Sequence, residues 1–176
     1  MHALYHDDEY GFPASVESVL FERLVLEINQ AGLSWLTILK KRTAFRAAFA
    51  DFDVDRVAAF GQADLDRLLA DSGIIRNRLK IEAAAENARR IQALRKSHGS
   101  LAAWLDAHHP RSLQEWTRLF RQTFRFTGGQ IVNEFLMSVG YLPGAHELDC
   151  PVFARILDLS PPWARTSAVA PAPARV

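Results

Sequence analysis

Glu27 is a carboxylate in the middle of an otherwise apolar segment. Apolar side chains recur at helical spacing over residues 18–29, and they comprise Val19, Leu20, Leu24, Val25 and Ile28. Glu22 and Arg23 fall on the opposite, polar side of this predicted helix. Burial of a carboxylate has a high free-energy cost unless the group is paired or hydrogen-bonded, so an unpaired one indicates a functional role. Glu27 is therefore a candidate functional group that could hold hydrogen-bond donors or a positive charge.

A pair of glycines, Gly128 and Gly129, lies between two predicted helices in the segment FRFTGGQ (residues 124–130). Paired glycines let the backbone turn tightly, and the amide groups at the start of the following helix can bind an anion. This arrangement is typical of a helix-hairpin-helix contact with a DNA phosphate, in which we include Arg125 and Thr127. On the glycines alone, an ordinary turn between two helices is the simpler interpretation.

Asp149 follows the hairpin by about 20 residues, in the segment LDCPVFARIL (residues 148–157). The spacing and the sequence are similar to those of helix-hairpin-helix base-excision DNA glycosylases, in which an aspartate at this place is catalytic. The resemblance implies that Asp149 stabilises a cationic sugar and orients or deprotonates the attacking water. A structural alternative is that Asp149 caps a helix whose first turn contains Pro151.

Two further features bear on DNA binding and on the type of reaction. The segment DSGIIRNRLKI (residues 71–81) resembles a helix start of the same superfamily, and its basic cluster is Arg76, Arg78 and Lys80. The alternative for this cluster is an ordinary exposed helix face. No lysine lies in or after the hairpin, because the lysines are Lys40, Lys41, Lys80 and Lys96. Bifunctional members of the superfamily form a Schiff base through a hairpin lysine, so the resemblance implies a monofunctional enzyme that leaves the strand uncut.

The N-terminal half is similar to the DNA-3-methyladenine glycosylase I family, often called TAG. The motifs that carry this resemblance are YHDDEYGFP (residues 5–13), LFE (20–22), LEINQAGLSW (26–35), LKKR (39–42) and GIIR (73–76). A methylated adenine of this kind carries positive charge, and the enzyme must flip its nucleotide out of the duplex to reach it. The family therefore implies a pocket for a cationic purine.

The resemblance assigns roles to particular side chains. Glu27 is implied to be the carboxylate that recognises the base, and the aromatic rings that bind the cation are Tyr5, Tyr10 and Trp35. Gln30 and Leu33 are implied to fill the duplex where the base has left. Tyr5 and Trp35 could instead be core aromatics, and Gln30 and Leu33 could simply pack a helix end.

The family's structural zinc has only part of its ligand set here. The resemblance assigns His6, His146 and Cys150 to that site, but the N-terminal cysteine of the family has no counterpart in the chain. Structural zinc is almost always four-coordinate and rich in thiolate. We therefore expect no cofactor to be required for catalysis and no bound zinc, although His2 could serve as a fourth ligand.

Helical spacing dominates the elements that must position these groups. Helices are expected over residues 18–29, 36–49, 64–69, 78–94, 100–107, 112–123, 131–139 and 151–157. Ser100 and Ser112 are expected N-caps, the latter with Glu115 in a capping box. No segment alternates with the period of a strand, so we predict an all-α, two-lobed bundle that contains the helix-hairpin-helix motif.

Composition narrows the class of protein. The 176 residues suffice for one domain, which we place at residues 1–159, and we expect the proline- and alanine-rich residues 160–176 to form a flexible tail. The N-terminal residues do not resemble a signal peptide, no apolar run is long enough for a membrane helix, and a single cysteine suits a reducing cytoplasm. The net charge of +1 means that DNA must be bound through local contacts.

The sequence therefore predicts a cytoplasmic, monomeric, monofunctional glycosylase that excises 3-methyladenine from double-stranded DNA. Two alternatives remain open. One is an enzyme with broader specificity for alkylated purines, and the other is a non-catalytic relative that only binds DNA.

Overall fold

The computed structural model describes residues 2–167, and within them the chain is helical with no strand. The longer helices are α2 (Glu17–Gln30), α3 (Trp35–Ala48), α5 (Gln62–Ala70), α6 (Arg78–His98), α8 (Leu113–Thr123) and α9 (Gly129–Ser138). The shorter ones are α1 (His2–Asp8), a 3₁₀ turn (Ala50–Phe52), α4 (Val54–Ala58), α7 (Leu101–His108), α10 (Pro151–Asp158) and α11 (Pro162–Ser167). The prediction of an all-α fold is confirmed.

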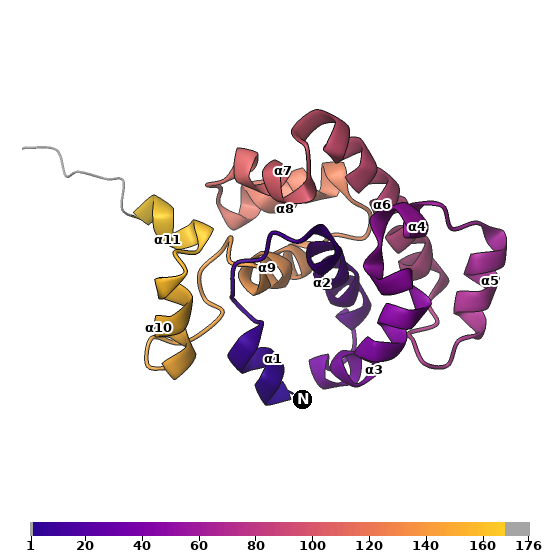
Figure 1. Cartoon of the computed structure of the whole chain (residues 1–176), viewed down its shortest axis with the longest axis horizontal. Coiled ribbons are helices and arrows are strands. Elements are labelled where there is room, and N and C mark those ends of the chain that lie inside the picture. Colours follow the sequence, from indigo (N-terminus) through magenta and orange to yellow (C-terminus); the bar gives the residue numbers. More distant parts are fainter. Residues whose placement is uncertain (1, 168–176) are drawn as a thin grey trace, which may run out of the picture.

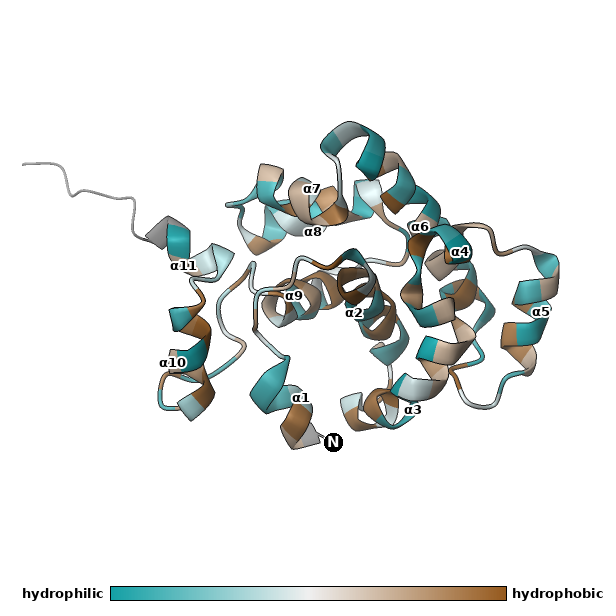
Figure 2. Cartoon of the chain, in the orientation of Figure 1, coloured by the Kyte–Doolittle hydropathy of each residue, from teal (hydrophilic) through white to brown (hydrophobic). Residues whose placement is uncertain are grey.

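Helix α2 lies between two groups of helices (Figure 1). One group contains α3 to α6, and the other contains α9 to α11 together with α1. Helix α2 packs against α3, α6, α7 and α9, and one apolar core continues through both groups. In Figure 2, α2 and α9 at the centre of the molecule contain much of the brown that marks apolar residues. A central helix with neighbours on several sides can present a side chain to a site enclosed between the two groups of helices.

The predicted helix starts are confirmed where side-chain chemistry marks them. The Ser100 side chain accepts a hydrogen bond from the Ala103 amide at the start of α7. Ser112 and Glu115 form the predicted capping box at the start of α8. These reciprocal bonds satisfy amide groups that would otherwise lack partners within the helix.

The prediction of a polar outer face on α2 is wrong. Glu22 and Arg23 are buried together with the apolar side chains of this helix. Their burial is possible because each has ionic partners: Glu22 binds Arg42 and Arg46, and Arg23 binds Glu9. A buried charge is tolerated when it is paired and hydrogen-bonded.

Helical structure continues past the predicted domain boundary at residue 159. Residues 162–167 form α11, and the Trp163 amide donates a hydrogen bond to the Gly140 carbonyl at 3.3 Å. The Trp163 ring also lies 6.2 Å from that of Phe153 on α10, centroid to centroid. A helix is possible here because proline is well suited to a first helical turn. The rest of the predicted tail, residues 168–176, lies outside the described residues.

Within residues 2–167, every helix is too short or too polar to span a lipid bilayer.

Candidate active site

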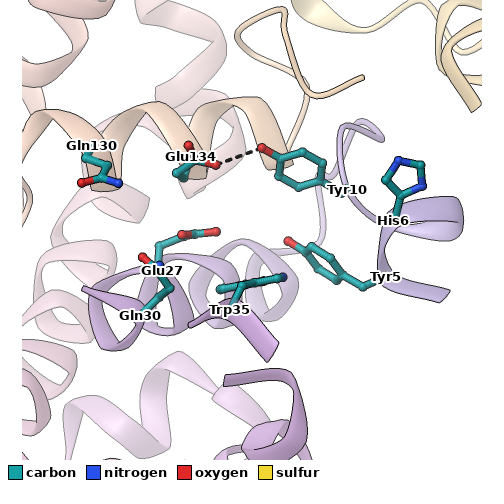
Figure 3. Close-up of a pocket in the computed structure, with 8 residues that line it drawn as sticks. All are labelled: Tyr5, His6, Tyr10, Glu27, Gln30, Trp35, Gln130 and Glu134. Atoms are coloured by element: carbon teal, nitrogen blue, oxygen red, sulfur yellow. Dashed lines mark hydrogen bonds between the residues drawn. The ribbon is translucent and has the colours of Figure 1, made fainter. Parts of the chain in front are cut away.

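A pocket of about 300 Å³ opens between α1, α2, the start of α3 and α9. Its lining residues are Tyr5, His6, Tyr10, Glu27, Gln30, Trp35, Gln130 and Glu134 (Figure 3). This volume lies at the lower end of the range of small-molecule sites and suits a single nucleobase. The structure therefore brings Glu27, Gln30 and the three aromatic residues predicted to bind the base into one pocket.

The aromatic side of the pocket is built around Tyr5. The centroid of its ring lies 5.1 Å from that of Trp35 and 5.8 Å from that of Tyr10. Arg23 fixes the ring by donating a hydrogen bond to the Tyr5 hydroxyl at 2.8 Å. The interpretation of Tyr5 as a core aromatic is partly right, since its side chain is buried, but it also lines the pocket. Aromatic faces so placed can bind a flat cationic ring.

Glu27 differs from the other buried carboxylate of α2. Its side chain is only 4% exposed, and among the described residues no group donates a hydrogen bond to its carboxylate. Burial, together with the neighbouring charge of Glu134, raises the pKa of Glu27 to about 8, against the smaller opposing effect of Arg23. A buried carboxylate without a protein partner carries an energetic cost that a cationic ligand with hydrogen-bond donors would relieve.

Glu22, by contrast, is fully paired. Its two carboxylate oxygens accept four hydrogen bonds of 2.6 to 3.0 Å from Arg42 and Arg46. Although burial raises the pKa of Glu22, the hydrogen bonds from these two arginines outweigh it and hold the pKa below its ordinary value. Arg42 also binds Glu9, which in turn binds the Arg23 that fixes Tyr5. This ionic network positions the aromatic wall of the pocket.

Two residues of the pocket, Gln130 and Glu134 on α9, were not among those predicted from the sequence. Glu134 accepts a hydrogen bond of 2.9 Å from the Tyr10 hydroxyl, 124 residues away in the chain. A signal for Glu134 was present in the sequence, because this carboxylate, next to Asn133, lies between the apolar pairs of residues 131–132 and 135–136.

Gln30 is the last residue of α2, and Leu33 follows it in the turn that leads to α3. Gln30 lines the pocket, and its side-chain amide donates a hydrogen bond to the Leu33 carbonyl at 2.9 Å. The Leu33 side chain is 39% exposed. An exposed apolar side chain three residues after a pocket residue is compatible with the predicted insertion into DNA.

The predicted hairpin joins α8 to α9. Its left-handed residue is Phe126 (φ 63°), whereas Gly128, the N-cap of α9, has φ −92°. The glycines are therefore not needed for the turn itself. A Cβ atom on Gly128 would meet nothing within 4 Å, so the absence of a side chain leaves the start of α9 open from outside.

The other predicted DNA contacts divide into exposed and inward-facing groups. Arg76 and Arg125 are exposed, whereas Thr127 is buried. The Thr127 hydroxyl donates to the Phe124 carbonyl at 3.4 Å, so the prediction of a DNA contact by Thr127 finds no support in its placement. Lys80 also departs from the predicted basic cluster: its ammonium group donates to the Asn29 and Ala31 carbonyls. Lysine in this position satisfies carbonyls at the end of α2.

The three predicted metal ligands, His6, His146 and Cys150, do converge. Their ligand atoms lie within 4.8 Å of one another, and the His146 Nδ1 to Cys150 Sγ distance is 3.5 Å. Standard Zn–N and Zn–S bonds at a tetrahedral angle place these two atoms about 3.5 Å apart. His146 Nε2 contacts the Tyr10 carbonyl at 2.7 Å, a second contact of the kind that orients metal-bound histidines. The three residues present therefore fit a zinc ion. The side chain of His2 lies outside the described residues.

Asp149 is not brought to the pocket. It is exposed and absent from the pocket lining, although His146 is buried and Cys150 is half-buried on either side of it. The prediction that Asp149 caps α10 is wrong, because Cys150 is the N-cap and no side chain caps this helix. The turn that directs His146 and Cys150 inward leaves Asp149 in solvent, which does not support its predicted contact with the sugar.

The fold is similar to that of solved DNA glycosylases. A structure of 3-methyladenine DNA glycosylase I from Staphylococcus aureus, which concerns 3-methyladenine recognition, superposes with a TM-score of 0.79 at 32% sequence identity. The match covers 86% of this chain and 90% of that one.

The sequence comparisons give the family. DNA-3-methyladenine glycosylase 1 of Escherichia coli (strain K12) is 34% identical over 169 residues, which is 85% of this chain and 90% of that protein. The DNA-3-methyladenine glycosylase of Haemophilus influenzae is 36% identical over 166 residues, or 84% and 89%. A family model described as methyladenine glycosylase matches residues 1–117. The chain belongs to the methyladenine glycosylase family, which confirms the predicted resemblance.

Proposed function

We propose that this protein hydrolyses the N-glycosidic bond of 3-methyladenine in double-stranded DNA and leaves an abasic site. The observation that carries the proposal is Glu27, a buried carboxylate with no described hydrogen-bond donor in a pocket of nucleobase size with aromatic walls. The relatives in this family are named as 3-methyladenine glycosylases, which supports the same substrate.

The chemistry follows from the charge of the substrate. An adenine methylated at N3 and bonded to sugar through N9 carries a fixed positive charge, which the aromatic rings and Glu27 would bind. When the glycosidic bond breaks, N9 keeps the bonding electron pair and the base leaves as a neutral molecule. Water then adds to C1′ of the sugar and loses its proton to solvent. A neutral adenine gains less from Glu27, and this difference gives selectivity.

The proposal places the start of α9 against a DNA phosphate. The open Gly128 position, the amide groups of the first helical turn and the exposed Arg125 lie at this end of α9. Exposed Arg76 adds a second positive charge at the start of α6. The absence of lysine from the hairpin supports a monofunctional reaction without a Schiff base.

Replacing Gly128 by Ala is expected to weaken DNA binding about tenfold without loss of stability. The added methyl group meets no protein atom within 4 Å, but it would stand between the helix start and a phosphate, where a charge-assisted hydrogen bond contributes about 1.5–3 kcal/mol. Fluorescence anisotropy with a DNA duplex measures the affinity. Gly61→Ala is the matched control, since Gly61 is also an N-cap with nothing within 4 Å. Equal affinity of Gly128→Ala and wild type would show that the hairpin is an ordinary turn.

The proposed function is tested by incubating the protein with DNA treated with a methylating agent. Formation of abasic sites without strand cleavage is the expected result, and chromatography of the released bases should show 3-methyladenine. Release of several alkylated purines at similar rates would favour the broader specificity. Binding of the DNA without any released base would leave only the non-catalytic alternative.

We further propose that the reaction needs no cofactor and that the protein acts as a cytoplasmic monomer. A zinc ion bound to His6, His146 and Cys150 would connect α1 to the loop before α10 and would have a structural role there. Treatment with a chelator is therefore expected to leave the single-turnover excision rate within twofold of the untreated rate. Metal analysis and circular dichroism of the same samples report zinc content and folding. Loss of excision that added zinc restores would contradict the proposal.

A further inference from the structure

The pocket contains a second carboxylate, that of Glu134, and it comes from the wall opposite Glu27. Figure 3 shows Glu134 and Gln130 on α9 facing Glu27 and Gln30 on α2. Each helix thus supplies one carboxylate and one amide, spaced so that the two side chains share a helix face. Helices α2 and α9 are packed against each other, so the two walls have a fixed separation.

Glu134 is held in place by only one described contact. The Tyr10 hydroxyl donates a hydrogen bond to Oε2 of Glu134 at 2.9 Å, and no described group donates to Oε1. Tyr10 thereby orients the carboxylate and leaves one of its oxygens available to a ligand. The Tyr10 hydroxyl proton is used in this bond, so Tyr10 offers the ligand its ring face and not a donor.

The charge of the pocket is one-sided. Its lining contains two carboxylates and no lysine or arginine. The nearest buried cation, Arg23, donates to the Tyr5 hydroxyl and to Glu9, and so it is engaged behind the aromatic wall. Carboxylates in a region of reduced dielectric constant attract a cation more strongly than they would in water. One carboxylate would suffice to accept hydrogen bonds from a base, whereas a second on the other wall adds chiefly to charge recognition.

We propose that Glu134, oriented by Tyr10, is a second base-binding residue that makes the pocket selective for purines with a fixed positive charge over neutral purines of the same shape. This inference rests on the proposed function and names the property by which that pocket distinguishes substrate from undamaged bases and from its own product. The product base is neutral once the glycosidic bond has broken, so the same charge preference would favour its release.

The test compares two ligands that differ by one methyl group and by charge. The cation is 3,9-dimethyladeninium, and the neutral ligand is 3-methyladenine, both titrated calorimetrically at pH 9. Glu134→Gln is expected to lower the ratio of affinities, cation over neutral ligand, about tenfold, mainly through weaker binding of the cation. Tyr10→Phe is expected to lower the ratio about threefold. Glu134→Asp keeps the charge and should keep the ratio within threefold.

Glu82→Gln is the matched control, because it removes the same charge from an exposed ion pair with Arg78 on α6. Its ratio should equal that of wild type within twofold. If Glu134→Gln leaves the ratio unchanged, whether or not both ligands bind more weakly, Glu134 has at most a structural role and this inference alone is overturned. If wild type binds neither ligand and releases no base from methylated DNA, the proposed function fails together with it.

Discussion

Replacement of Glu27 by Gln is expected to slow single-turnover release of 3-methyladenine from DNA about 100-fold. Glutamine has nearly the same size and can still accept a hydrogen bond, but it cannot balance the positive charge of the base. Removal of one preorganised electrostatic contact from an active site costs about 10²–10³ in rate. Because Glu27 has no described ionic partner, the substitution leaves no protein charge unpaired, and folding should be retained.

The same variant should change the pH dependence of binding. Burial raises the pKa of Glu27 to about 8, so in the absence of a cation the carboxyl group is mostly protonated at pH 7. A bound cation favours the ionised form, and binding of 3,9-dimethyladeninium should therefore release a proton. The affinity of wild type should rise as the pH increases towards 8 and level off above it. In Glu27→Gln this rise should be smaller, because the variant lacks the carboxyl group whose pKa burial raises to about 8.

Asp149→Asn is the control for excision. This residue is exposed and lies outside the pocket, so its substitution should leave the rate within twofold of wild type. The reverse pattern, a slow Asp149→Asn and a normal Glu27→Gln, would mean that the pocket described above is not the site of the reaction.

The second large effect concerns stability. Glu22→Gln is expected to lower the free energy of unfolding by about 3 kcal/mol, because removal of one member of a buried ionic group leaves its partners uncompensated. Arg42 and Arg46 each contact both oxygens of Glu22, and Arg42 is itself largely buried. Urea unfolding followed by circular dichroism at pH 7 measures the difference.

The difference in the free energy of unfolding between wild type and Glu22→Gln should decrease at acidic pH. Hydrogen bonds from the arginines hold the pKa of Glu22 below the ordinary glutamate value of 4.5 in the folded protein. The stabilisation that ionised Glu22 gives to the folded protein is therefore present above pH 4.5 and is lost as the pH falls below that value. Glu82→Gln removes an exposed contact of 3.7 Å and should cost less than about 0.5 kcal/mol. Equal effects of the two substitutions would contradict a structural role for the network.

Local features of the fold could be predicted from the sequence. The starts of α7 and α8 depend on Ser100, Ser112 and Glu115, whose capping bonds involve residues three positions apart. The short helices were harder to predict, because α1 and α4 have too few residues for a helical period to appear. Helix α11 begins at Pro162 directly after Pro161, a composition typical of a linker, yet its Trp163 amide donates a hydrogen bond to the Gly140 carbonyl.

One wall of the pocket could be predicted from local sequence alone. Glu27 and Trp35 belong to a single motif within residues 26–35. A carboxylate in an apolar helix indicates a functional role when that helix is buried. The contrast between Glu22 and Glu27, five positions apart on α2, depends instead on tertiary contacts, because the arginines that neutralise Glu22 come from α3. Glu134 becomes part of the pocket through the packing of α9 on α2. Asp149 stays outside the pocket because the turn that directs His146 inward leaves it in solvent. Side-chain partners drawn from distant segments depend on how helices pack, and no local spacing encodes that arrangement.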